Sequence, residues 1–310
     1  MHLRRRQRAA LSRVLYPLLL AGSVLLARVL LGHGVGGGVA VTLVILTALL
    51  VVTGLERLMP YRREWNVRAG DLPQDVAYLG IGAVMQPLAR SVAEGAVAAG
   101  IIALHAAWPT LAWTRRAGLD PWALALLGLA ASDLVKYAIH RKSHESAWLF
   151  RFHAAHHAPE RIYGVNGIRL HPVNLLWNLV PDALVPLALG LGGTELVLVA
   201  AFRGTVAALQ HANVELRLGP LDWIFSTPTL HRMHHATKLA DANSNYGSTF
   251  IVWDLLFGTR NPPRPNEPVT LGLADGIQPP RLAAQLLWPW CEARATTCRL
   301  LRWSGHTPPS

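Results

Sequence analysis

Charged residues are scarce in this chain. Only 15% of its 310 residues are Asp, Glu, Lys or Arg, against about 25% in an ordinary soluble protein. In contrast, 52% of the residues are apolar and the mean hydropathy is +0.28. The chain has just two cysteines, Cys291 and Cys298, which excludes a disulfide framework and leaves free thiols as the default.

Two catalytic signatures are also missing. The chain has no H-E-x-x-H motif of a zinc hydrolase, and a catalytic zinc uses only about three protein ligands. It has no haem-attachment motif either, so electrons for any redox chemistry must come from another protein.

Basic residues outnumber acidic ones by 29 to 18, but they flank apolar runs and form no nucleic-acid module. This placement favours anionic lipid heads and an acidic protein partner over nucleic acid.

Long apolar runs are what the chain has instead. A helix needs about 20 mainly apolar residues to cross a bilayer. Five regions approach or exceed that length: 14–31, 39–54, 76–107, 122–139 and 175–209. The fifth is interrupted at Gly190–Gly193, which predicts a hairpin. A large soluble helical core is the alternative to a set of membrane spans.

The placement of Lys and Arg predicts the orientation of these spans. The N-terminal arm and the loop at 55–75 are basic, so both are predicted to be cytosolic. The fourth and fifth regions then end on that same side. We predict an all-α integral membrane protein, with about four transmembrane helices or two long hairpins under a cytosolic helical cap. Both termini would be cytosolic, and in a bacterium the membrane would be the inner one.

The histidines of this chain are strongly clustered in the sequence. Eight of the 14 histidines lie in HRKSHESAWLFRFHAAHH (140–157) and HRMHH (231–235). Residues three and four apart share a helix face, so each set is predicted to point its imidazoles one way. Neutral imidazole suits iron, zinc and copper, and three such faces are more than one metal can use. The pattern predicts a site for two metals, whereas a surface metal-storage tract would be low in complexity.

Two local features predict how these histidines are presented. The nine residues from His144 to His153 amount to about 180° at about 100° per residue, so one straight helix would aim the two sets apart. We therefore predict a break within 146–151, with the second set on its own short helix. Thr227 and Pro228 predict the start of the third helix, because Thr can cap and Pro fits the first turn.

Further polar residues lie near these clusters in sequence. Carboxylates and amides beside metal-bound imidazoles usually orient the ring through its second nitrogen. His211 ends the fifth apolar region, and Glu215 shares its face if the helix continues. The candidates for metal binding or ring orientation are His171, Glu215, Asn166, Arg169, Asp241, Asn245 and Asp254. For Asp254, as for Asp133, a surface or helix-end position is the alternative.

The order of the motifs identifies a family. HRKSH, HAAHH, RLHP, HANVE, HRMHH, NYG and WDLLFGT, over about 125–260, resemble the fatty acid hydroxylase and sterol desaturase superfamily of integral-membrane di-iron oxygenases. The stretch LGPLDWIFSTPTLHRMHH looks most like the bacterial sterol-desaturase-like and alkylglycerol monooxygenase branches. Some members carry a further histidine at the position of Glu215. The resemblance implies that iron is bound by His140, His144, His153, His156, His157, His211, His231, His234 and His235.

The resemblance also implies a domain plan. Residues 1–124 would form a membrane anchor with the cytosolic loop at 55–75, and 125–260 the histidine-box catalytic domain. Residues 261–310 would form a tail. Its stretch 281–303 combines Trp and Arg, which predicts an amphipathic helix on the membrane surface, with a docking helix as the alternative.

The implied activity is hydroxylation of an aliphatic C–H bond of a lipid, either a fatty acyl chain, a sterol or an ether lipid. It would use two iron ions, O2 and two electrons from a ferredoxin, a cytochrome b5-type protein or a reductase. Zinc would be able to replace iron in purified protein. The lipid would enter from the bilayer and be oxidised near its polar end, with Arg169, Asn166 and Glu215 as candidates to hold the head. A desaturase on the same site, or a non-catalytic zinc- or lipid-binding membrane protein, are the alternatives.

Overall fold

The computed structural model describes residues 5–67, 70–109, 118–264, 269–273 and 282–290; side chains at 5, 86–94, 96–98 and 101 are not described. Within these residues the protein is built of helices, and its β contacts are isolated bridges. The α-helices are α1 (Arg5–Gly32), α2 (Gly37–Leu58), α3 (Leu72–Ala107), α5 (Pro121–Glu145), α6 (Ala147–His157), α7 (Pro172–Leu179), α8 (Val185–Ala188), α9 (Gly193–Gln210), α10 (Pro228–His234), α11 (Leu239–Ala242), α12 (Val252–Leu256) and α13 (Leu282–Leu287). The prediction of an all-α fold is confirmed.

Three of the described helices, α1, α2 and α5, are long and apolar enough to cross a membrane. Large apolar side chains on them are exposed, such as Leu25 at 65% and Leu50 at 74%. Such surface suits lipid better than water. The third apolar region forms the continuous helix α3. The fifth forms a hairpin of α7, a π-helical turn (Val180–Leu184) and α8, followed after the predicted glycine interruption by α9, whose Arg203 donates to the carbonyl of Pro181 at 3.3 Å.

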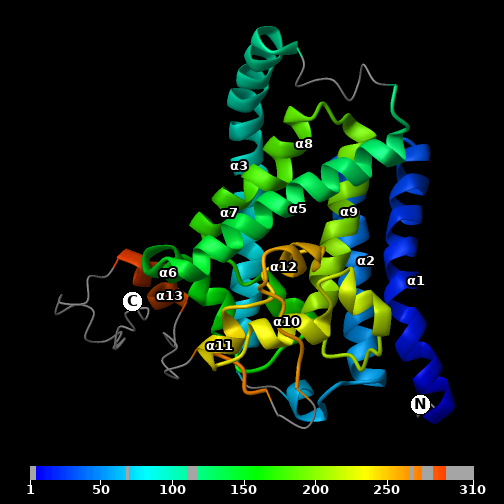
Figure 1. Cartoon of the computed structure of the whole chain (residues 1–310), viewed down its shortest axis with the longest axis vertical. Helices are drawn as coiled ribbons and strands as arrows, with labels where there is room; N and C mark the ends of the chain where they lie inside the picture. The colour runs from blue at the N-terminus through cyan, green and yellow to red at the C-terminus, as the bar shows by residue number, and fades with distance from the viewer. Residues whose placement is uncertain (1–4, 68–69, 110–117, 265–268, 274–281, 291–310) are drawn as a thin grey trace.

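Helix α9 lies at the centre of the bundle, against α1, α2 and α5 (Figure 1). Two apolar clusters join α9 to the first two helices. One contains Tyr16, Val52 and Leu209, and the other contains Ala27 and Val44 among its members. Ile45 of α2 packs so closely on α9 that a Cβ on Gly204 would lie 2.6 Å from its side chain. The tight packing of α1, α2 and α9 fixes where α9 delivers the residues that follow it.

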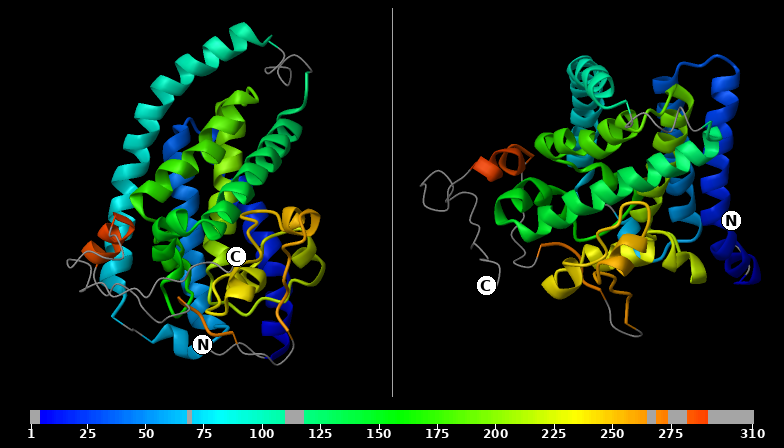
Figure 2. Two further views of the ribbon diagram at one scale, coloured as in Figure 1. Left: turned by 60° about the vertical axis from the view of Figure 1, so that its left-hand side comes forward. Right: turned by 45° about the horizontal axis from the view of Figure 1, so that its top comes forward.

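The start of α1, the end of α2 and the segment after α9 meet at one end of the molecule. There the N–H of Glu215 donates to the carbonyl of Met59 at 2.9 Å, and that of Arg217 donates to the carbonyl of Ser12 at 2.9 Å. Helices α6, α10 and α11 lie toward the same end, away from the α1–α2 turn (Figures 1 and 2). The N-terminal arm, the connector after α2 and the histidine helices therefore share one end, in the arrangement that the Lys and Arg pattern predicts.

The predicted break between the first two histidine sets is confirmed. Helix α5 ends at Glu145, and Ser146 adopts an extended backbone conformation with φ −106° and ψ 117°. The Ser146 side chain then caps α6 by accepting a hydrogen bond from the N–H of Leu149 at 3.3 Å. A short polar residue at a helix start satisfies a backbone donor that has no helical partner. Helix α6 therefore turns away from α5 at the place that the spacing requires.

The third histidine helix, α10, begins at Pro228 as predicted, but its cap differs. Thr227 makes no capping hydrogen bond with its side chain; its hydroxyl donates to the carboxylate of Asp222 at 2.5 Å. The helix is also short. His231 and His234 lie within it, and His235 is the first residue after its end.

The described part of the C-terminal segment, α13 and a 3-10 turn (Trp288–Trp290), docks against the bundle. Gln285 accepts a hydrogen bond from the Tyr78 hydroxyl at 3.0 Å, and the Trp290 ring lies 5.2 Å from that of Phe152. These contacts fit the docking alternative for residues 282–290. Residue 281 and residues 291–303 of the predicted amphipathic stretch lie outside the described residues.

Candidate metal centre

All nine histidines named by the sequence converge inside the cap. They form two groups, and within each group one ligand atom per residue lies within 4.8 Å of the others. The first group is His140, His144, His153, His157 and His234, and the second is His156, His211, His231 and His235. The groups adjoin, because the rings of His157 and His235 stack across their boundary with centroids 4.3 Å apart.

The two short helices each contribute to both groups. Helix α6 gives His153 and His157 to the first group and His156 to the second, whereas α10 and its end give His231 and His235 to the second and His234 to the first. Residues four apart lie on one face, which keeps each pair together. The expectation that each set points all its imidazoles in one direction is therefore too simple, because the single histidine of each set turns to the neighbouring group.

Hydrogen bonds at Nδ1 fix the state of several rings. His140 Nδ1 lies 2.7 Å from the carbonyl oxygen of Tyr246, and His234 Nδ1 lies 2.7 Å from that of Ser244. A carbonyl can only accept, so in both rings the proton is on Nδ1 and the Nε2 lone pair is bare. These two Nε2 atoms nevertheless face each other at 3.0 Å.

Opposed lone pairs inside a protein repel unless a cation lies between them. The same crowding occurs in the second group, where His231 Nε2 lies 2.9 Å from His211 Nε2 and 3.1 Å from His235 Nε2. In the part of the chain that the structure describes, His144 Nε2 is buried and has no hydrogen-bond partner, although buried polar atoms are nearly always paired. The donor set, its crowding and this unpaired nitrogen fit a metal ion in each group.

Burial keeps these imidazoles neutral. It lowers the pKa of His153 to about 4, and the pKa values of His211 and His234 to about 3. Taking an imidazolium out of water is unfavourable, so the neutral base is preferred. The neutral form is also the one that binds a metal, and the rings are thus ready to act as ligands near neutral pH.

Asp254 and Asn245 shape the loop that orients His140. The Asp254 carboxylate is fully buried and accepts hydrogen bonds from the N–H groups of Tyr246 at 2.8 Å and Gly247 at 2.7 Å. It therefore fixes the carbonyl of Tyr246 that faces His140. Asn245 adopts a left-handed backbone conformation with φ +52° and donates to the carbonyl of Leu230 on α10 at 3.1 Å. The surface alternative for Asp254 is wrong.

Asp133 is buried too, inside α5. Its carboxylate accepts hydrogen bonds from the N–H groups of Thr249 and Phe250, both at 2.8 Å. This ties the loop after the third histidine set to the helix that carries the first. Asp241 binds the side chains of Asn261 at 2.9 Å and Arg264 at 3.2 Å, so it holds the 241–264 loop together and contacts neither histidine group.

Asn166 is the outer partner of the second group. Its side-chain oxygen lies 3.1 Å from His211 Nδ1, and its amide nitrogen donates to the carbonyl of Arg161 at 2.6 Å. An acceptor at Nδ1 leaves Nε2 free for a metal. Arg169 is 1% exposed, and its guanidinium forms an ion pair with Asp75 of α3, so in this structure it ties the 158–174 loop to the anchor.

His171 and Glu215 lie outside both histidine groups. His171 caps α7 by accepting from the N–H of Val173 at 3.1 Å, and its other ring nitrogen lies 3.0 Å from the carbonyl of Leu286. Glu215 does not share a face with His211, because α9 ends at Gln210. Its carboxylate instead pairs with Arg8 at 2.8 Å and with Arg217 at 3.2 Å.

One orienting residue escaped the sequence reasoning. The side-chain oxygen of Asn174, on α7, lies 2.9 Å from His153 Nδ1. The available signal was an amide in a mainly apolar helical run, two residues after Pro172. Glu56 was missed as well. Its buried carboxylate accepts from the N–H of Gly164 at 2.7 Å and of Asn213 at 2.9 Å, which joins α2 to the loops on both sides of His211.

A methyl group added at Gly167 is expected to weaken metal binding by the second group. The Cβ of Gly167→Ala would lie 2.9 Å from the His211 ring, closer than Cβ contacts allow, so the ring has to shift. A ligand displaced by tenths of an ångström loses affinity, and we expect about a tenfold loss, similar to that from removing an orienting partner. Metal titration of the purified variant measures it. Gly193→Ala, whose Cβ would have nothing within 4 Å, is the control and should bind as the unchanged protein does.

The chain thus combines three helices of membrane-spanning length with nine imidazoles in two adjoining groups, which defines a helical protein with a polyhistidine centre able to bind metal. The fatty acid hydroxylase family model matches residues 125–259. Ornithine lipid hydroxylase OlsE of Rhizobium tropici is 36% identical over 229 residues, covering 72% of this chain and 68% of that protein. The chain belongs to the fatty acid hydroxylase family, and it is an oxidoreductase like these relatives.

More distant relatives agree with this assignment. Alkylglycerol monooxygenases of Xenopus tropicalis and Homo sapiens are each 30% identical over 156 residues, half of this chain. The match covers only 33% and 34% of those two proteins. No solved structure matches the chain.

Proposed function

We propose that this protein is a multi-pass membrane di-iron oxygenase that hydroxylates an aliphatic C–H bond of a lipid. The observation that carries the proposal is the pair of adjoining groups of five and four buried histidines. A catalytic zinc site uses about three protein ligands and keeps one position open, so nine imidazoles exceed what a zinc hydrolase needs. Imidazole suits iron, and iron held there would supply the reductive activation of O2.

The chain's own residues have three tasks in this proposal. The nine histidines hold the metals as neutral ligands, and the acceptors at Nδ1 fix which nitrogen is presented: Tyr246, Ser244, Asn166 and Asn174. Burial excludes bulk water, which protects an oxidising site from side reactions.

The overall reaction consumes one O2, two electrons and two protons for each alcohol and water formed. A ferredoxin, a cytochrome b5-type protein or a reductase would supply the electrons.

The substrate class follows from the relatives and the fold together. The relatives named above are an ornithine lipid hydroxylase and alkylglycerol monooxygenases, all enzymes of lipids. The histidine helices adjoin candidate membrane spans at one end of the bundle, which would let a lipid reach the centre from the bilayer with its polar end near the surface. We therefore propose oxidation near the polar end of the lipid.

The function is tested on purified protein reconstituted with iron, a reductase system and total lipids from the source cell. We expect two irons per chain and O2 uptake that depends on added lipid. The product should be heavier than its parent lipid by one oxygen. A loss of two hydrogens would instead identify a desaturase, and one zinc per chain with no O2 uptake would contradict the proposal.

Thiol labelling can test which side of the membrane each segment faces. We propose that the start of α1, the connector after α2 and both histidine groups face the cytosol. In a variant with Cys291 and Cys298 replaced by serine, Val35→Cys should react with an impermeant thiol reagent on intact cells. Glu64→Cys, which is exposed in the connector, should react only after the cells are permeabilised. The opposite labelling pattern would refute this orientation.

A further inference from the structure

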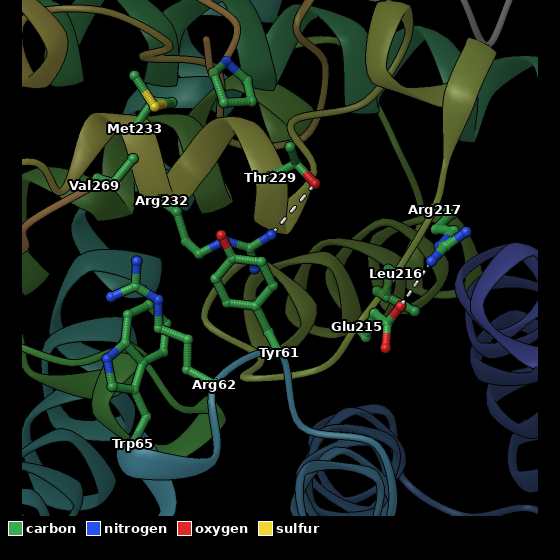
Figure 3. A pocket seen from close by; sticks show the side chains of 11 residues that line it. Tyr61, Arg62, Trp65, Glu215, Leu216, Arg217, Thr229, Arg232, Met233 and Val269 are labelled. Atoms are coloured by element: carbon green, nitrogen blue, oxygen red, sulfur yellow. Dashed lines mark hydrogen bonds and ion pairs between the residues drawn. The ribbon is translucent and has the colours of Figure 1, made fainter. Parts of the chain in front are cut away.

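A second polar site lies beside the histidine centre but is separate from it. A pocket of about 240 Å³ lies between the connector after α2 and helix α10 (Figure 3). Its polar and aromatic lining consists of Tyr61, Arg62, Trp65, Glu215, Arg217, Thr229 and Arg232. No histidine of either group lines it. The pocket holds several times the volume of one water, which is about 30 Å³, so it has room for a small polar group.

Arg232 is the unusual member of this lining. It is only 5% exposed, and its guanidinium lies over the ring of Tyr61, 3.9 Å from the centroid. One terminal nitrogen, Nη2, makes a long hydrogen bond of 3.4 Å to the hydroxyl of Thr229. The other, Nη1, is buried and has no hydrogen-bond partner among the residues that the structure describes. A buried guanidinium without an anion is strongly unfavourable, and the stacking on Tyr61 holds it in place without satisfying that donor.

The nearby carboxylates make no hydrogen bond to the free donor of Arg232 within the described residues. Glu215 already forms ion pairs with Arg8 at 2.8 Å and with Arg217 at 3.2 Å. Asp222 is close enough for its charge to act on Arg232, but among the described residues no hydrogen bond from its carboxylate reaches the free Nη1. Arg62 adds a further positive charge, and its ion pair with Glu64 is long, at 4.0 Å. The pocket therefore has an excess of positive charge around an unsatisfied donor.

The position of the pocket points to the source of its ligand. Candidate span α2 ends at Leu58, and Tyr61 follows three residues later. Arg8, near the start of candidate span α1, donates to the carbonyl of Pro60 at 2.9 Å. The ends of both spans thus lie beside the pocket, and aromatic and basic residues just past a span lie at the level of lipid headgroups.

We propose that this pocket binds the phosphate of a phospholipid headgroup, with Arg232 as the main donor and Arg62 at its opening. A guanidinium presents paired N–H donors that match phosphate oxygens, which would satisfy the free Nη1 atom. Binding of phosphate at this site needs no oxidation chemistry, so the binding can be tested independently of the proposed hydroxylase activity.

Thermal unfolding of the full-length purified protein tests the site. Phosphatidylglycerol in mixed micelles is expected to raise Tm by several degrees, whereas diacylglycerol with the same acyl chains should not. Arg232→Gln should lose most of that rise, and Arg62→Gln part of it. The Tm of Arg232→Gln without lipid is expected to equal or exceed that of the unchanged protein, because the substitution removes an unpaired buried charge. A purely structural arginine would give the opposite, a lower starting Tm with the lipid effect intact.

Arg63→Gln is the matched control. Arg63 is exposed on the same connector and does not line the pocket, so this variant removes an equal charge and should keep the full lipid effect. Inorganic phosphate, added at the same phosphate concentration and ionic strength, separates the two sources of the anion. An equal rise with phosphate alone, lost in Arg232→Gln, would support the anion site but overturn the lipid as its source. No rise, or the same rise in Arg232→Gln, would overturn the site.

Discussion

Alanine in place of His157 or His235 is expected to abolish lipid-dependent O2 uptake, with a loss of at least about 100-fold. Even the outer partners of metal ligands contribute 10- to 100-fold to affinity or activity, and these two residues are ligand candidates themselves. They belong to different groups, yet their rings stack at 4.3 Å, so each substitution also opens a cavity beside the other group. We therefore expect the metal content of either variant to fall from two ions per chain to one or none.

Metal analysis by mass spectrometry and an oxygen electrode measure both effects on the same preparation. His33→Ala is the control, because His33 is exposed in the turn between α1 and α2 and far from both groups along the bundle. It should keep two ions and full O2 uptake. Two ions and full uptake in His157→Ala or His235→Ala would contradict the assignment of these residues as ligands.

Asparagine in place of Asp254 is expected to lower metal affinity by about 10- to 100-fold and to lower the stability of the fold. The carboxylate accepts from the N–H groups of Tyr246 and Gly247 and from the hydroxyl of Thr259. An amide has one accepting oxygen, so its NH2 group would face one of these donors. Leaving a buried donor unsatisfied costs about 1–3 kcal/mol, and the Tyr246 carbonyl would lose its fixed position against His140.

Metal titration followed by thermal unfolding separates the two consequences in this variant. Asp120→Asn is the matched control, because Asp120 also accepts from a backbone N–H, that of Trp122 at 2.8 Å, but at the start of α5 away from the centre. Asparagine caps helices as well as aspartate does, so neither property should change. Unchanged metal affinity in Asp254→Asn would show that the 245–247 loop does not orient His140.

The hydrogen-bond and ion-pair partners of the residues around the histidine groups could not all be predicted from the sequence. Asn166 was expected near the site and does face His211, but Arg169, three residues later, pairs with Asp75 of α3. Both lie in one loop and neither has a periodic pattern that predicts its direction. The partner of Arg169 comes from another helix 94 residues earlier in the chain. The partner of Glu215, Arg8, comes from the first helix, and nothing near Glu215 in sequence could have indicated it.

The sequence by itself determined the helices, the break at Ser146 and the start at Pro228. These features depend on interactions over a few residues, where helix periodicity, capping and proline geometry act. The set of nine histidines was implied by the resemblance of the ordered motifs to a family. Only the tertiary structure decided how the nine histidines divide into five and four, because that division depends on the relative rotation of α5, α6, α9 and α10. The rotation is set by the packing of these helices and by buried contacts such as those of Asp133 and Asp254, which join segments far apart in the chain.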